Sequence, residues 1–100
     1  MKSNEEIEKI LTDAFGSGGG VSVNYDENEK TWEVIFNDTD ENGECWMDVT
    51  TLGRLNMQGL VYAGEQTGID YEDGEEDNLE TYYMDIFYFK HIEITNINQN

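Results

Sequence analysis

One segment of the chain constrains the fold more than any other. Between Leu79 and Lys90, both alternating faces are rich in apolar residues. One face carries Thr81, Tyr83, Asp85, Phe87 and Phe89, and the other carries Tyr82, Met84, Ile86 and Tyr88. A strand with apolar residues on both faces is typical of the middle of a packed sheet. We therefore expect a central strand here, with Ile92 and Ile94 as an extension.

Shorter alternating segments predict the rest of the sheet. Strands are expected over Val21–Asp26, Trp32–Asn37 and Cys45–Val49, and a short strand is expected to begin at Ile69. The turn over Asp26–Lys30 favours Asn28 as its residue with positive φ, since Asn tolerates the left-handed region. The first three strands then form an antiparallel meander.

Two helices complete the prediction. Ser3-Asn4-Glu5-Glu6 fits a capping box, and an apolar stripe follows at helical spacing: Ile7, Ile10, Leu11 and Ala14. A second helix is expected from Thr50 or Thr51 through Ala63, with Gly68 as its stop. The fold class is α+β: an antiparallel sheet of about five strands with two helices, in the order α-β-β-β-α-β-β. Residues 1–100 form one domain, with residues 95–100 frayed.

Charge is the second constraint. The chain carries 23 Asp and Glu against five Lys and Arg, a formal net charge of -18. A magnitude of about 2–8 suffices for solubility in a small domain, and any excess repels itself. The acids concentrate in Asp26–Asp48 and Glu65–Asp85, where Lys30 is the single base.

This concentration predicts a basic partner. Carboxylates two residues apart on a strand lie about 6.6 Å apart, which is inside the physiological Debye length of about 8 Å. Such a row presents a nearly continuous negative potential, which suits a groove that binds phosphates through Lys and Arg. The predicted binding residues are Asp38, Asp40, Glu41, Glu44, Asp70, Glu72, Asp73, Glu75, Glu76, Asp77 and Glu80. Tyr62, Tyr71 and Tyr82 are candidate anchors within this acidic field.

Two other interpretations of the acids stay open. One is a solvated acidic surface without a specific partner. The other is a calcium site, because Asp38–Gly43 matches the first half of an EF-hand loop. Val49 occupies the position where that loop needs a bidentate Glu, and its flanks are typical of strands. A hairpin turn rich in Asp and Asn explains the same residues, so we predict no metal site.

The residues that carry chemistry are sparse. His91 is the single histidine and Cys45 the single cysteine, and no catalytic motif is present. We therefore expect a protein that is not an enzyme and needs no cofactor. Met1–Glu6 lacks the apolar run of a signal peptide, and no segment approaches about 18 apolar residues. We expect a cytoplasmic protein that binds neither membranes nor nucleic acid directly, since phosphates would be repelled.

In size, charge and mixture of elements, the whole chain resembles a functional class, the small acidic anti-CRISPR and anti-restriction inhibitors of phages, many of which mimic DNA. The resemblance involves no diagnostic motif and transfers no functional residue. It implies a non-enzymatic inhibitor whose acidic face occupies the DNA-binding groove of a bacterial nuclease complex, in the host cytoplasm. An immunity protein that neutralises a basic toxin, such as a nuclease, is the alternative. A calcium-binding or acid-surfaced module is the third.

Overall fold

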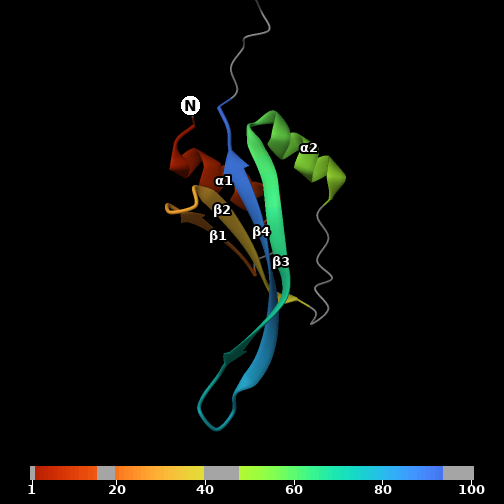
Figure 1. Cartoon of the computed structure of the whole chain (residues 1–100). Coiled ribbons are helices and arrows are strands. Elements are labelled where there is room, and N and C mark those ends of the chain that lie inside the picture. The colour runs from red at the N-terminus through yellow and green to blue at the C-terminus, as the bar shows by residue number, and fades with distance from the viewer. Residues whose placement is uncertain (1, 16–19, 40–47, 94–100) are drawn as a thin grey trace, which may run out of the picture.

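The computed structural model describes residues 2–15, 20–39 and 48–93, apart from the side chain of Asp38. Its elements follow the order α-β-β-α-β-β (Figure 1). They are α1 (Asn4–Phe15), β1 (Val21–Asp26), β2 (Thr31–Thr39), α2 (Val49–Met57), β3 (Leu60–Asp73) and β4 (Glu80–His91). The α+β class is confirmed, and the described sheet has four strands rather than about five.

The strand predicted to be central is central. The four strands are antiparallel neighbours in the order β1-β2-β4-β3. Phe89 of β4 pairs with Trp32 of β2 on one side and with Tyr62 of β3 on the other. Apolar residues on both faces of β4 thus marked the strand that has a neighbour at each edge.

The first helix begins as its sequence predicts. The Glu6 amide donates to Ser3 Oγ at 3.2 Å, and the Ser3 amide donates to Glu6 Oε1 at 3.3 Å, which completes the capping box. Ile7 and Leu11 are buried, whereas Ala14, the last member of the predicted stripe, is exposed.

The second helix is shorter than predicted, and the strand after it is longer. α2 ends at Met57 because Gly59 turns the chain at φ 85°, and the Gly59 carbonyl accepts a hydrogen bond of 2.7 Å from the Ile92 amide. A side chain at Gly59 would collide with the Ile92 carbonyl. Leu60 therefore enters β3, so the predicted helix through Ala63 and the stop at Gly68 are wrong.

The strand predicted over Cys45–Val49 is not part of the described sheet. Val49 is the first residue of α2, and residues 45–47 lie outside the described residues. The cap is also displaced, because Asp48 rather than Thr50 or Thr51 precedes the helix. The Asp48 carbonyl accepts from the Leu52 amide at 2.9 Å.

The turn between β1 and β2 places its positive φ at Lys30 (59°) rather than at Asn28. Asp26 Oδ1 accepts hydrogen bonds from the Asn28 and Glu29 amides at 2.9 and 3.3 Å, as a helix N-cap does. The Lys30 amide then donates a hydrogen bond to the Asp26 carbonyl at 2.8 Å. These bonds form a single helical turn, and helical turns commonly end in a left-handed residue. The positive φ therefore falls at Lys30, the last residue of the turn.

The core lies on one face of the sheet, between the strands and both helices. Its buried members are Ile7 and Leu11 of α1, Leu55 of α2, and Trp32, Val34, Leu60, Phe87 and Phe89 of the sheet. These residues lie toward the end of the sheet where β1, β2 and the helices gather. The β3–β4 hairpin projects in the opposite direction, away from the helices (Figure 1).

Candidate partner-binding surface

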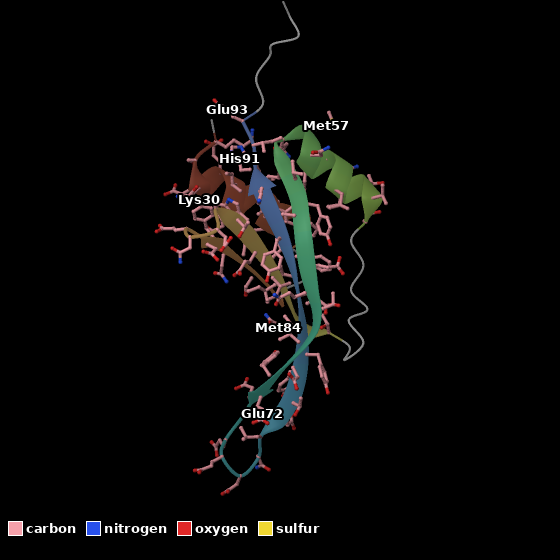
Figure 2. All side chains as sticks on the ribbon, in the orientation of Figure 1. Lys30, Met57, Glu72, Met84, His91 and Glu93 are labelled. Atoms are coloured by element: carbon pink, nitrogen blue, oxygen red, sulfur yellow. The ribbon has the colours of Figure 1, made fainter. Side chains whose placement is uncertain are left out.

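The hairpin of β3 and β4 continues as a two-stranded ribbon after β2 has ended. The last pairing of β2 joins Thr39 to Tyr83, and Tyr83 in turn pairs with Asp70. We name residues 70–83 the acidic arm. It carries seven carboxylates and no Lys, Arg or His: Asp70, Glu72, Asp73, Glu75, Glu76, Asp77 and Glu80. All seven side chains are exposed, and Figure 2 shows Glu72 on the projecting part of the hairpin.

Two hydrogen bonds donated by backbone amides define the tip of the arm. The Asn78 amide donates to the Glu75 carbonyl at 2.7 Å, which closes a turn around Glu76 and Asp77. The Gly74 amide donates to Asp73 Oδ1 at 2.9 Å. The tip therefore has a defined conformation that presents its carboxylates to solvent.

Like charges face each other across the ribbon. Asp73 pairs directly with Glu80, and such pairs destabilise a sheet by up to about 1 kcal/mol. Asp70 and Glu72 lie on the opposite face of β3, about 6.6 Å apart by strand geometry. Stability alone would favour a Lys at one of these positions. The absence of any base from residues 70–83 therefore favours a role for the charge outside the fold.

Two tyrosines form an aromatic platform within the arm. The rings of Tyr71 and Tyr82 are stacked across the strands, with centroids 5.7 Å apart and planes at 29°. The Tyr82 hydroxyl donates to Glu80 Oε2 at 2.6 Å. Both side chains are half-buried, so the ring pair stiffens the ribbon and leaves aromatic surface among the carboxylates.

Tyr62, the third predicted anchor, lies away from the arm at the other end of β3. It is 39% exposed, and its ring contacts Phe89 edge-on. Its hydroxyl donates to Glu65, and desolvation together with this bond and the charge of Glu65 raises the pKa of Tyr62 to about 12. Tyr62 therefore stays neutral at physiological pH.

The predicted binding residues fall into two sets. The seven from Asp70 to Glu80 lie together on the acidic arm. Asp38 lies in β2 rather than in the predicted turn, one residue before the Thr39–Tyr83 pair at the base of the arm. Asp40, Glu41 and Glu44, and with them most of the EF-hand-like segment, lie outside the described residues.

A buried carboxylate at the base of the arm was not among the predicted site residues. Thr67 and Gly68 of β3 oppose the single residue Asp85 of β4, which makes a β-bulge. Asp85 is fully buried, and its Oδ1 accepts a hydrogen bond of 2.9 Å from the Gly68 amide, where the chain turns through φ 67°. One signal was available: Asp85 interrupts the apolar face formed by Tyr83, Phe87 and Phe89.

This contact yields a stability prediction. Asp85→Ala removes the acceptor of the Gly68 amide and should lower the free energy of unfolding by about 2 kcal/mol, because an unsatisfied buried donor costs about 1–3 kcal/mol. Asp85→Asn keeps an acceptor and should cost less than about 1 kcal/mol. Urea denaturation followed by circular dichroism measures both values. Equal losses in the two variants would show that the bond does not stabilise the bulge.

Three basic residues lie around one cleft at the opposite end of the molecule. A cleft of about 280 Å³ beside the start of α1 is lined by Lys2, Asn4, Ile7, Tyr25, Lys30, Trp32 and His91. In Figure 2, Lys30 and His91 lie at the end remote from Glu72. The arm thus carries acids without bases, whereas at this end bases and acids are mixed, with Lys30 next to Glu29 in the β1–β2 turn.

The described residues contain no group of three or more His, Cys, Asp or Glu arranged to bind a metal ion. A larger cleft of about 460 Å³ separates α1 from α2 and is lined by Ile10, Asp13, Ala14, Thr51, Arg54, Leu55 and Gln58. It contains one acid and one base, without a nucleophile–base pair. No helix in the described ranges is long and apolar enough to span a bilayer.

Comparisons of this chain with protein-family models, with curated proteins and with solved structures found no match.

Proposed function

We propose that this protein is a non-enzymatic inhibitor that binds a basic nucleic-acid-binding protein, such as a CRISPR nuclease or a restriction complex. In this proposal the acidic arm enters the groove that normally receives DNA. The observation that carries it is the arm itself, a ribbon with seven exposed carboxylates and no base.

The charge density of the arm supports the comparison with nucleic acid. The paired part of the arm, residues 70–73 against 80–83, is about 13 Å long, and the turn extends it to at most about 20 Å. Seven carboxylates over that length give one negative charge per about 2–3 Å, between the roughly 1.7 Å of duplex DNA and the roughly 3.4 Å of one strand. Lys and Arg side chains spaced to neutralise phosphates would meet carboxylates at a similar density.

The shape of the arm supports the same proposal. The two backbones of a ribbon lie about 4.8 Å apart, so the arm is narrower than the four-stranded part of the sheet. It carries carboxylates on both faces, with Asp70 and Glu72 on one and Asp73 and Glu80 on the other. A projection charged on both faces is suited to a cleft with basic walls on either side.

The distribution of charge supports an encounter through the arm. The arm carries seven acids and no base, whereas elsewhere in the described residues bases lie among acids, as Lys30 does beside Glu29. A positive groove would therefore attract the arm most strongly, which steers association toward this end of the molecule. The same field repels DNA and RNA, so the proposal implies no direct binding of nucleic acid. Because the proposed targets act in the cytoplasm, it also implies a cytoplasmic protein, in the host cell if a phage encodes it.

The test is competition with DNA. Purified CRISPR nucleases and restriction complexes are incubated with labelled target DNA and increasing amounts of the protein, and DNA binding is followed by fluorescence anisotropy. We expect displacement of DNA from at least one of them. Direct binding of that complex without DNA should weaken more than tenfold between about 0.1 and 1 M NaCl, where the Debye length falls from about 10 to 3 Å.

Two outcomes would contradict the proposal. Binding to a complex whose DNA remains in place would exclude occupation of the groove, and binding that salt leaves unchanged would exclude the electrostatic account. Including a basic nuclease toxin among the targets tests the immunity-protein alternative. Neutralisation of that toxin, without effect on the other complexes, would replace the proposed target class.

A further inference from the structure

One face of the sheet has no helix over it. The buried sheet residues that pack against α1 and α2, among them Val34, Phe87 and Phe89, all point to the same face. In the described ranges no helix covers the other face, which turns toward the viewer in Figure 1. A water-facing surface of an antiparallel sheet is ordinarily polar.

The centre of this uncovered face is apolar. Ile35 of β2 pairs with Ile86 of β4, and Met84 of β4 pairs with Ile69 of β3. Together with Tyr88 they form a contiguous patch of half-buried side chains. We name Ile35, Ile69, Met84, Ile86 and Tyr88 the apolar strip. Alternation along β3 and β4 continues the strip directly into the Tyr71–Tyr82 platform of the arm.

The dimensions of the apolar strip match those of one helix. It crosses three neighbouring strands, which gives a width of about 10 Å, and from Met84 to Tyr88 it is about 13 Å long. With the adjoining Tyr71–Tyr82 platform the apolar surface is about 20 Å long. A helix with its side chains is about 10–12 Å wide, and about 14 residues span 20 Å. On the covered face, the 12-residue α1 packs Ile7 and Leu11 onto the sheet.

Carboxylates bracket the apolar strip. Beside Tyr88, burial together with the charges of Glu33 and Asp26 raises the pKa of the Tyr88 hydroxyl. At the other end, Asp73 and Glu80 follow the tyrosine platform on the same face. Lys90 is the one base among the described residues of β4 on this face, and it lies beyond Tyr88, away from the arm. The complementary surface is therefore apolar in its middle and basic at its ends.

We propose that the apolar strip binds an amphipathic basic helix of the target protein while the acidic arm occupies the groove for nucleic acid. This inference rests on the proposed function and assigns the second half of the same interface. The charge of the chain argues against a second copy as the occupant, because two molecules of net charge -18 repel each other. Apolar contacts would then hold the complex, and the arm would guide its formation.

The test uses three synthetic peptides of about 14 residues and equal positive charge. One is a Leu/Lys peptide with Leu at i, i+3, i+4 and i+7 spacing, the second is its scrambled form, and the third replaces Leu by Ser. Their affinities for the full-length protein are measured by calorimetry at about 0.1 M NaCl. We expect the amphipathic peptide to bind at least tenfold more tightly than the other two. Equal affinities would overturn the proposal without any variant being made.

Variants then locate the binding. Ile35→Thr with Ile86→Thr keeps β-branched residues in both strands, and it should abolish the preference for the amphipathic peptide while residual binding remains. Asp73→Lys with Glu80→Lys should weaken all three peptides by similar factors. Circular dichroism verifies that each variant is folded. If the Thr variant retains the full preference, the helix binds elsewhere. If sedimentation shows a dimer of the wild type that the Thr variant abolishes, a second copy covers the strip.

Different outcomes would contradict the proposed function and the helix-binding role of the apolar strip. Loss of the peptide preference with intact, salt-dependent displacement of DNA would remove the apolar strip from the interface and leave the arm in place. A peptide preference with no displacement of DNA from any nuclease would retain a helix-binding surface and remove the proposed target class.

Discussion

Replacement of Asp73, Glu75 and Glu76 by lysine is expected to weaken inhibition of the target nuclease about 100-fold. Each change removes an attraction and adds a repulsion in the basic groove. At about 1 kcal/mol for each of three partly desolvated positions, the loss is about 3 kcal/mol, which corresponds to a factor of about 100. The inhibitor concentration for half-maximal DNA cleavage measures this loss directly.

The control for this variant has the same net charge. Glu8, Glu27 and Glu29 are exposed and lie on α1 and in the β1–β2 turn, at the end remote from the arm. Their replacement by lysine also changes the formal charge from -18 to -12, because each substitution shifts it by two. If position matters, this control should inhibit within about threefold of the wild type, a difference of about 0.7 kcal/mol. Equal losses in both variants would mean that total charge, and not the arm, determines inhibition.

The salt dependence of binding is a second measurement that distinguishes the arm variant from its control. The arm variant should lose most of the salt dependence of binding, because the groove no longer meets a row of carboxylates. The control variant should keep it. Both variants should unfold at temperatures no lower than the wild type, since removal of like charges relieves self-repulsion. An arm variant that unfolds earlier would instead indicate a structural role for these carboxylates.

The sequence predicted the fold best where one physical signal acted alone. Apolar residues on both faces of β4 marked the central strand, and Ser3 with Glu6 marked the start of α1. It failed after Met57, where Leu60 and Ala63 continue the helical spacing of Leu52 and Leu55. The competing signal was Gly59, whose positive φ and close contact with the Ile92 carbonyl depend on a residue more than 30 positions away. No local pattern contains that contact.

The candidate site also has a part that the sequence predicts and a part that only the structure shows. The run from Asp70 to Glu80 was recognisable as one acidic surface because its residues are close in sequence and sit around one turn. Its projection beyond the sheet depends on where β2 stops, at Thr39, and on the bulge opposite Asp85. The apolar strip combines residues of β2, β3 and β4, so it exists only once the register of three strands is known.

Phe87→Ala is expected to cost about 3–5 kcal/mol of unfolding free energy, the range for removal of a buried aromatic side chain. Phe87 is 1% exposed, lies in the central strand and contacts Phe36 edge-on at a centroid distance of 5.5 Å. Domains of this size have about 5–15 kcal/mol of stability, and self-repulsion at -18 charges opposes folding. The variant should therefore be substantially unfolded at low salt and regain structure in about 1 M NaCl, where the Debye length is about 3 Å. Urea titrations at both salt concentrations measure the effect.

Tyr62→Ala is the matched control, because it also removes a ring from the sheet but from a site that is 39% exposed. Its cost should be well under half that of Phe87→Ala, since less apolar surface leaves the core and little cavity remains. Equal costs would contradict a core centred on β4. If Phe87→Ala stays unfolded at high salt, packing rather than charge limits the stability of the domain. Recovery in salt would show that the charge proposed to bind the target also brings the fold close to its limit of stability.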